Sequence, residues 1–170
     1  GASSMYTWQF AKSLWTSNEL DLQRFETMTN FYNLCYREEE REMIPFCKDQ
    51  NISVLPYSPV AKGFLTGKYT RNEKNDTIRF KTDPRLAERF FKPEDFDVLE
   101  IVMQISNEKG VKPAQIALAW LLEKNTAPII GVTKKSHVED AVESLNIKLT
   151  SNDMKQLEEP YKMHPTTGYE

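Results

Sequence analysis

Apolar residues recur along this chain with two spacings, one typical of helices and one typical of short buried strands. Where every third or fourth residue is apolar, the spacing predicts helices with one buried face, at residues 3–16, 36–49, 95–107 and 136–145. Compact runs rich in aromatic and β-branched residues predict strands at residues 25–33, 52–57 and 127–132. Strands that alternate with helices indicate parallel βαβ units, so the pattern predicts an α/β fold.

Individual residues indicate where several of these helices begin, bend or end. Ser3 and Ser4 are candidate N-caps for the first helix, because a serine hydroxyl can accept a hydrogen bond from the first free N–H groups. Pro45 lies inside the second predicted helix and is expected to kink or shift it. Gly110 interrupts the helical pattern, and Pro113 suits the first position of a further helix.

Two segments with a less regular pattern follow the central strand. Residues 58–93 are rich in Gly, Pro, Lys, Asn and Asp, and a loop of that length inside a compact domain is usually functional or mobile. Residues 150–170 are expected to form a short helix ending at Glu158 and an irregular tail, because Thr150-Ser151-Asn152-Asp153 resembles a capping box. The whole chain, residues 1–170, fits one domain.

Composition and charge exclude several classes of function. The 170 residues are 39% hydrophobic and carry a formal net charge of −3, which argues against a nucleic-acid or anionic-membrane surface as the main partner. No apolar run approaches the roughly 20 residues that span a bilayer, and no signal segment opens the chain, so we expect a cytoplasmic protein. Cys35 and Cys47 lack a nearby His/Cys cluster, which favours two buried thiols over a metal site. The acidic run at residues 38–42 is expected to be a solvated helix face.

The ends of the first three predicted β-type segments carry side chains that could contact a ligand. Ser3 and Ser4 could hydrogen-bond a carboxamide, although on their own they favour a plain helix cap. Polar side chains around Thr29 end the next apolar segment and could reach a ligand. Tyr57 ends the central strand and offers an aromatic face on which a planar ring could stack.

Two further segments could bind phosphate. Residues 58–68 combine small residues, which let backbone N–H groups approach an anion, with Lys62 and Lys68, although a surface turn with solvated lysines is the alternative. Residues 130–140 join a strand ending in glycine to a helix start with one threonine and two lysines. Neither segment has the spacing of a P-loop, and the chain contains no GxGxxG motif.

Several quoted segments together resemble the aldo-keto reductase family. GASSM, FYNLCYREEEREMIPFC, YSPVAKGFLTGKY, AQIALAWLL and PIIGVTKKSHVEDAVESL occur in the order and spacing of that family, and EEPYKMHPTTGYE resembles its aryl-alcohol-dehydrogenase-like branch. The resemblance covers essentially the whole chain. It implies the C-terminal half of a (β/α)8 TIM-type barrel, from about strand 5 or 6 to strand 8.

The resemblance implies that one group of residues holds the nicotinamide end of a dinucleotide. Ser3 and Ser4 would hold the carboxamide, and Thr29 stands where the family usually has a glutamine, a departure that weakens this contact. Tyr57 would stack on the nicotinamide ring. The pyrophosphate would lie along the following turn, which carries Ser58, Pro59, Val60, Lys62 and Gly63.

A second group would hold the adenosine end. Gly131, Thr133 and Lys134 would meet the ribose and its 2′-phosphate. His137 stands where the family often has Gln or Arg, and Asp140 stands where an acid faces the adenine. The cationic residues near Lys134 favour NADP(H) over NAD(H), because lysine pairs with the additional phosphate.

The resemblance implies an NADP(H)-dependent reductase of aldehydes and ketones, aryl aldehydes among them, acting on small carbonyl substrates. The family's catalytic Asp, Tyr, Lys and His come from the first four strands, and no residue of this chain can be assigned to them. We therefore expect the isolated chain to be inactive. Because a half-barrel leaves two open strand edges, we also expect it to associate with itself or with a missing N-terminal half. The alternative is a non-catalytic module that binds nicotinamide dinucleotides or assembles with a partner chain.

Overall fold

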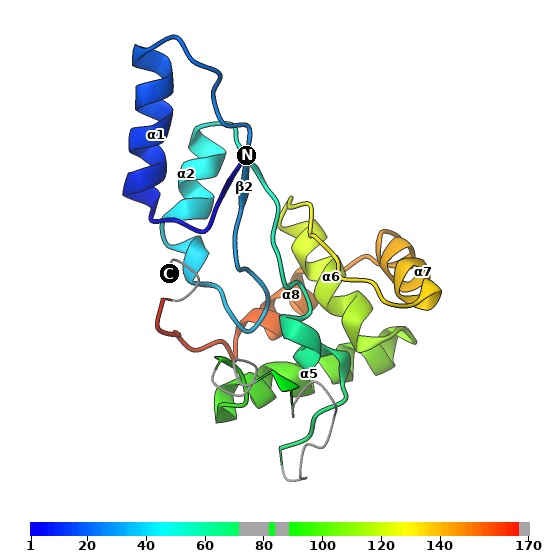
Figure 1. Cartoon of the computed structure of the whole chain (residues 1–170). Helices are drawn as coiled ribbons and strands as arrows, with labels where there is room; N and C mark the ends of the chain where they lie inside the picture. The colour runs from blue at the N-terminus through cyan, green and yellow to red at the C-terminus, as the bar shows by residue number, and fades with distance from the viewer. Residues whose placement is uncertain (72–81, 84–88, 167–170) are drawn as a thin grey trace.

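A computed structural model describes residues 1–71, 82–83 and 89–166, in which strands alternate with helices (Figure 1). The strands are β1 (Ala2–Ser3), β2 (Thr27–Thr29) and β3 (Ser53–Val54). The α-helices are α1 (Thr7–Glu19), α2 (Met43–Asp49), α5 (Pro93–Lys109), α6 (Pro113–Glu123), α7 (Lys135–Ser144) and α8 (Ser151–Glu158). The segments η1 (Glu38–Glu40) and η2 (Ala61–Thr66) are 3₁₀-helical.

The strands form one open parallel sheet in the order β1-β2-β3. An extended segment continues it beyond β3, because the N–H groups of Ala127 and Ile129 donate to the carbonyls of Val54 (3.0 Å) and Pro56 (2.7 Å). That segment coincides with the strand predicted at 127–132, although its pairing is too short to form a full ladder. The prediction of a mixed α/β fold with parallel strands is confirmed.

The first two predicted strands are longer than the observed ones. The strand expected at 25–33 pairs regularly only over Thr27–Thr29, and the strand expected at 52–57 pairs only over Ser53–Val54. An isolated parallel bridge between Phe31 and Tyr57 prolongs the contact past the regular ladder. The apolar runs therefore predicted which segments contribute strands, while the regular ladders are shorter than those runs.

The prediction that Ser3 and Ser4 cap the first helix is wrong. Helix α1 begins at Thr7; Ser3 is the last residue of β1, and Ser4 directly follows it. The N–H of Ser4 donates to the Thr29 carbonyl (3.0 Å), and Ser4 has a left-handed backbone with φ of 43°. Pairing with the neighbouring strand thus uses the backbone groups that a helix start would need.

The helix predicted over 36–49 is divided in two. The 3₁₀ segment η1 precedes α2, and Pro45 is the third residue of α2. A proline is tolerated there because the first four N–H groups of a helix have no partner inside the helix. Of the two outcomes expected for Pro45, a kink or a shift of the helix, the structure shows a shift: the α-helix starts later than predicted.

The remaining helix predictions are confirmed to within a few residues. Pro113 is the first residue of α6, and Gly110 ends α5 with φ of 65°, a conformation that a glycine adopts without strain. Thr150 Oγ accepts from the Asp153 N–H (3.1 Å), while an Asp153 carboxylate oxygen accepts from the Thr150 N–H (2.8 Å), which completes the predicted capping box. Helix α8 ends at Glu158, as expected.

Two apolar clusters hold the elements together. One lies between the sheet, α1 and α2, around Phe10 and Met28, and the larger one joins α5, α6 and α8 to the turn after β3, around Phe64 and Trp120. Of the loop expected at 58–93, residues 72–81 and 84–88 lie outside the described residues, as do residues 167–170 of the tail. Within the described part of the chain, no helix has the length and apolar character needed to cross a bilayer.

Candidate functional site

The register of the parallel strands brings the ends of neighbouring strands to one edge of the sheet. Ser3 lies opposite Thr29, and Phe31 lies opposite Tyr57 across the next pair. The extended segment bonds to β3 and runs parallel to it, so that Gly131 follows at the same edge. Four predicted ligand-contacting segments therefore leave the sheet on one side, which we call the rim.

Ser4 and Tyr57 meet at this rim. The Ser4 hydroxyl lies 3.4 Å from the Tyr57 hydroxyl and can donate to it, and the Ser3 hydroxyl donates to the Thr29 carbonyl (3.2 Å). The Tyr57 ring is half-buried and packs against the Phe31 ring, with centroids 5.4 Å apart. Because one end of the tyrosine is fixed by Ser4 and one side by Phe31, its ring keeps a defined orientation.

The turn after Tyr57 has an unusual backbone. Ser58, Ala61 and Lys62 have φ values of 54°, 50° and 55°, and Gly63 follows with φ of 96°. Left-handed conformations of non-glycine residues cost about 1–3 kcal/mol each and concentrate at functional sites. Among the residues expected along a pyrophosphate, Val60 is half-buried and Pro59 is buried in the turn.

Lys62, the cation expected beside the pyrophosphate, is engaged in an ion pair. Its Nζ lies 2.7 Å from a carboxylate oxygen of Asp83, and its side chain is only partly exposed. The carboxylate neutralises the ammonium at short range, so an anion that binds here must share Lys62 with Asp83. No sequence pattern indicated this pairing, because twenty-one positions separate the two residues.

The helix start after the extended segment carries exposed cations. Lys134 is the N-cap residue of α7, and Lys135 pairs on the surface with Glu139 at 3.3 Å. The N–H of Thr133 lies 3.4 Å from His137 Nδ1, which holds the two residues together. This group projects into solvent from the rim, as a phosphate-binding helix start does.

Asp140 is turned toward the neighbouring helix. One of its carboxylate oxygens lies 2.6 Å from Lys112 Nζ at the start of α6. The pKa of Lys112 is raised, chiefly because of this hydrogen bond to Asp140. Asp140 thus connects α7 to the start of α6.

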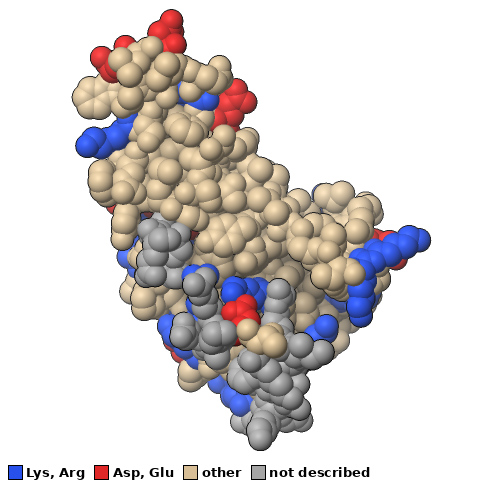
Figure 2. Space-filling model, in the orientation of Figure 1, with Lys and Arg blue, Asp and Glu red and all other residues tan. Residues whose placement is uncertain are grey.

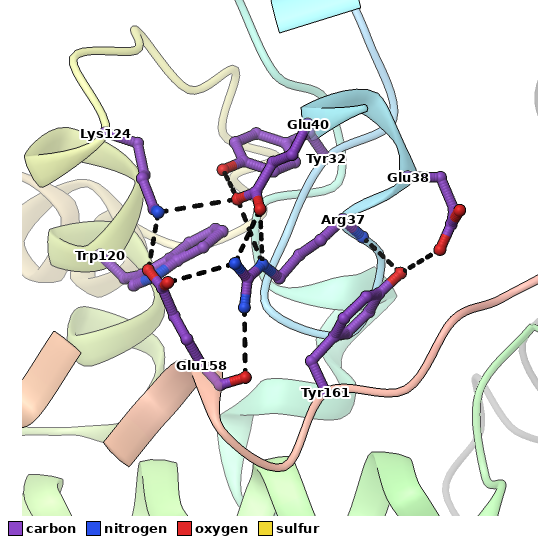
Figure 3. Close-up of polar contacts among 8 residues, drawn as sticks. All are labelled: Tyr32, Arg37, Glu38, Glu40, Trp120, Lys124, Glu158 and Tyr161. Atoms are coloured by element: carbon purple, nitrogen blue, oxygen red, sulfur yellow. Dashed lines mark hydrogen bonds and ion pairs between the residues drawn. The ribbon is translucent and has the colours of Figure 1, made fainter. Parts of the chain in front are cut away.

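A partly buried ionic junction anchors the loop that follows β2 (Figure 3). The Arg37 guanidinium binds both carboxylate oxygens of Glu40 (2.7 and 3.1 Å), and it also contacts the Glu158 carboxylate at 3.1 Å. It lies against the ring of Trp120, at 5.7 Å from the centroid. Lys124 Nζ adds a further contact to Glu158 at 2.7 Å. Loop 31–37, α6 and α8 therefore meet at one arginine.

The expectation that the acidic run at 38–42 is a solvated face is wrong for Glu38, Glu39 and Glu40, while Arg41 and Glu42 are exposed as expected. Glu39 is 2% exposed and accepts a hydrogen bond from Asn30 Nδ2 (2.9 Å), while Glu38 accepts from the Tyr161 hydroxyl at 2.6 Å. Glu40 receives Arg37, as described above. The pattern that reveals this role is an arginine placed three positions before a glutamate in a segment rich in aromatic residues, since such carboxylates have partners that permit their burial.

The junction changes the pKa values of its members. Burial by itself raises the pKa of Glu158, but hydrogen bonds from Lys124 and Trp120 and the charge of Arg37 outweigh it and hold that pKa below its ordinary range. Burial and the neighbouring Glu40 carboxylate raise the pKa of Tyr32, whose hydroxyl donates to Glu40 at 2.5 Å. The junction thus keeps Glu158 ionised and Tyr32 neutral at pH 7.

The C-terminal tail is held against the same loop. The His164 N–H donates to Glu38 (3.1 Å), and the imidazole lies between Asp95 (3.1 Å) and Lys92 (3.2 Å) at the start of α5. The His164 ring also packs near Tyr36 in loop 31–37, with centroids 6.4 Å apart. Both the junction and the tail therefore support the loop that places Phe31 beside Tyr57.

A direct bond connects this loop to the rim. Asn33 Nδ2 donates to the Ser58 carbonyl (3.2 Å), and Asn33 Oδ1 accepts from the Cys35 N–H (3.0 Å). Both predicted thiols are buried, and burial, aided by the charge of Glu39, raises the pKa of Cys47 to about 11. Cys35 is fully buried and its pKa is raised for the same primary reason, so the prediction of two buried thiols is confirmed.

Comparison with known proteins places this geometry in context. The sequence profile described as "Aldo/keto reductase family" matches residues 1–162. A Schizosaccharomyces pombe protein that carries the name aryl-alcohol dehydrogenase is 39% identical over 168 residues, covering 99% of this chain and 51% of the relative. A Saccharomyces cerevisiae protein of the same name is 38% identical over 165 residues, covering 95% of this chain and 47% of the relative.

A relative that carries a different name is similar over nearly the same length. Versiconal hemiacetal acetate reductase of Aspergillus parasiticus is 37% identical over 172 residues, covering 97% of this chain and 49% of the relative. The chain spans about half the length of the curated relatives it matches.

Proposed function

Because the chain belongs to the aldo/keto reductase family, we propose that it is the cofactor-binding, C-terminal half of a (β/α)8 barrel reductase. The proposed reaction is NADP(H)-dependent reduction of aldehydes and ketones, including aryl aldehydes. The observation that carries the proposal is the shared rim, where parallel strands bring Ser4, Tyr57 and the start of α7 to one edge. In such barrels, ligands bind at the carboxyl ends of the strands.

The residues at the rim fit a nicotinamide ring. The Tyr57 ring is half-buried and held in one orientation, which is what stacking of a planar ring requires. The hydroxyls of Ser3 and Ser4 lie 3.5 Å apart beside it and can exchange hydrogen bonds with a carboxamide. Thr29 offers a shorter side chain than the glutamine usual in the family, so we propose that the serines carry this contact.

The turn and the helix start fit the phosphates. The run of left-handed residues from Ala61 to Gly63 presents the backbone at close range, and Gly63 has open space where a side chain would project. Lys134 and Thr133 stand at the start of α7, where N–H groups and cations favour a 2′-phosphate. His137 is held against Thr133, so we propose that its ring borders the adenine.

The bound dinucleotide supplies the hydride, and this chain supplies position and orientation. Tyr57 would hold one face of the ring, and the serines would fix its rotation through the carboxamide. The Arg37 junction and the His164 contacts keep loop 31–37 in place, so Phe31 supports Tyr57 from the side. The carbonyl substrate would approach the uncovered face.

Titration with NADPH and NADH tests this proposal in the isolated chain. We expect binding of NADPH, followed by intrinsic fluorescence or calorimetry, and about tenfold weaker binding of NADH, which lacks the 2′-phosphate. Lys134→Ala should weaken NADPH binding by about tenfold and leave NADH binding unchanged, because it removes a charge-assisted contact to that phosphate alone. Lys148→Ala, at an exposed lysine after α7, is the matched control and should change neither.

The aromatic contact has its own pair of variants. Tyr57→Phe keeps the ring and should retain most of the affinity, whereas Tyr57→Ala removes the stacking surface and should weaken both dinucleotides by about tenfold or more. Loss of affinity in Tyr57→Phe equal to that in Tyr57→Ala would assign the effect to the hydroxyl and contradict stacking. Absence of any dinucleotide binding by the unchanged chain would reject the proposed function itself.

A further inference from the structure

Two buried asparagines follow β2 three positions apart, and their side chains hold different partners. Asn30 Nδ2 donates to the Glu39 carboxylate (2.9 Å), which lies in η1 a few residues later. Asn33 Nδ2 donates instead to the Ser58 carbonyl (3.2 Å), twenty-five positions along the chain. Both asparagines are 0% exposed. Of the two side chains, only that of Asn33 therefore reaches the turn after Tyr57.

The Ser58 carbonyl is the group that this bond orients. It also accepts from the Ala61 N–H (2.9 Å), so two donors converge on one oxygen. Ser58 has a left-handed backbone with φ of 54°, and such a conformation persists only where its surroundings enforce it. The next residue, Pro59, has a φ fixed by its ring and has no N–H, so this carbonyl is the only hydrogen-bonding group of the peptide unit between them. The bond from Asn33 thus sets the direction in which the turn leaves the sheet.

The same turn carries backbone donors that the protein does not use. Over the described part of the chain, neither the Ser58 N–H nor the Val60 N–H donates to a protein acceptor. A backbone N–H is an obligatory donor, so each of these two requires water or a ligand. The turn therefore offers an anion two backbone donors, in addition to the Lys62 ammonium that it must share with Asp83.

The surrounding surface makes these backbone donors important. Figure 2 shows a broad stretch without charged side chains between the region of α1 and that of α7, on the face that this view presents. The exposed lysines at the start of α7 belong to the other end of the proposed dinucleotide, at its 2′-phosphate. Binding of the pyrophosphate in the proposed site therefore depends on N–H groups whose directions are fixed by the folded turn.

We propose that Asn33 is a positioning residue for the pyrophosphate of the dinucleotide, an assignment that rests on the proposed function. By holding the Ser58 carbonyl, its amide directs the N–H groups of Ser58 and Val60 toward the bound phosphates. Asn33 itself does not touch the cofactor, because its side chain is buried and bonds to protein groups, the Ser58 carbonyl and the Cys35 N–H. Its effect on affinity should therefore disappear when the ligand has no pyrophosphate.

The same substitution at the two asparagines tests this role in the 170-residue chain. Asn33→Ser is too short to reach the Ser58 carbonyl but keeps an oxygen for the Cys35 N–H, and it should weaken NADPH binding by about tenfold. Binding of 2′-AMP, which carries the 2′-phosphate and no pyrophosphate, should change by less than about twofold. Asn30→Ser is the matched control: it removes an equally buried amide that donates to Glu39, and it should change both affinities by less than about twofold.

Amide hydrogen exchange followed by NMR is a second measurement, and it needs no variant. In the unchanged chain, NADPH should slow exchange at the Ser58 and Val60 amides, whereas 2′-AMP should not. This measurement decides the matter if circular dichroism shows that Asn33→Ser loses helix content. Exchange at both amides that NADPH leaves unaltered would overturn the proposal, and so would equal losses of NADPH affinity in Asn33→Ser and Asn30→Ser.

These outcomes differ from a failure of the proposed function. An unchanged chain that binds no NADPH rejects the dinucleotide site, and the positioning role of Asn33 with it. A chain that binds NADPH equally well after Asn33→Ser keeps the dinucleotide site and overturns the positioning role alone. A loss of 2′-AMP affinity in Asn33→Ser as large as the loss for NADPH also overturns it, because the effect then reaches beyond the pyrophosphate.

Discussion

At the scale of single residues, buried charge in this chain occurs where several partners share it. The Arg37 side chain is 12% exposed and is surrounded by Glu40, Glu158 and the Trp120 ring. A buried charge that loses one partner leaves another uncompensated, which makes such clusters more costly to break than surface pairs. The junction therefore connects loop 31–37 to α6 and α8, and the loss of any one of its side chains should destabilise it.

Glu158 provides a pH-dependent test of this junction. Its pKa is lowered in the folded chain, so its contribution to stability is full above the ordinary value of 4.5 and declines as the pH falls below it. Glu158→Gln should reduce the free energy of unfolding in urea by about 1–2 kcal/mol at pH 7, a figure that allows for the quarter of the side chain that is exposed.

The difference between Glu158→Gln and the unchanged chain should stay nearly constant from pH 7 down to about pH 5 and should narrow as unfolding is measured further down, toward about pH 3. A glutamic acid that becomes protonated resembles glutamine, so the two proteins converge. Glu159→Gln removes the same charge from an exposed neighbouring position and should change the free energy of unfolding by less than about 0.5 kcal/mol at pH 7. A difference that stays constant over this pH range would show that the charge of Glu158 is not what stabilises the junction.

At the scale of elements, local signals set the boundaries of some helices and not of others. Helix α8 begins at Ser151 with a reciprocal cap between Thr150 and Asp153, and both hydrogen bonds lie within four residues. Thr150→Ala should lower the free energy of unfolding by about 1 kcal/mol, because it removes one of the two bonds. Thr150→Ser keeps the hydroxyl and serves as the control. Equal losses in thermal or urea unfolding would mean that the cap does not hold the helix start.

The same distinction explains what could be predicted from the sequence. The caps of α8, the proline start of α6 and the glycine end of α5 depend on neighbouring residues, and all were predictable. The start of α1 was not, because Ser4 bonds across the sheet to Thr29, twenty-five positions away. The predicted exposure of the acidic run was wrong at Glu38 for the same reason, since the partner of that carboxylate is Tyr161, 123 positions along the chain.

In the candidate site, too, local patterns were predictable and contacts between distant residues were not. Sequence pattern placed Tyr57 and the helix start after Gly131 at strand ends, and parallel strands then bring such ends to one edge. The Lys62–Asp83 and Asp140–Lys112 pairs were beyond reach, because each joins residues that only the folded chain brings together. Residue type identified the candidate contacts, and tertiary pairing decided which of their charges remain available.

At the scale of the whole molecule, this chain combines the four strand ends of the rim with an open sheet. The family profile covers nearly all of it, yet the relatives extend to about twice its length. The described part therefore has the features proposed for holding a dinucleotide, while the catalytic residues of the family remain unassigned in it. Binding and turnover are consequently separable properties here, and a measurement of one does not imply the other.

Turnover is the property that we expect the 170-residue chain to lack. Reduction of a carbonyl requires a proton donor beside the carbonyl oxygen, a role that contributes about 10²–10⁴-fold in rate and usually requires a tuned pKa. The histidines are engaged elsewhere, since His164 lies between Asp95 and Lys92 and His137 is held against Thr133. Tyr57 faces Ser4 and is the proposed stacking surface.

Purified chain mixed with NADPH and benzaldehyde should oxidise the cofactor no faster than buffer, in the same preparation that binds NADPH by titration. Oxidation that increases in proportion to protein concentration, and that Tyr57→Phe abolishes without weakening binding, would instead identify Tyr57 as a proton donor.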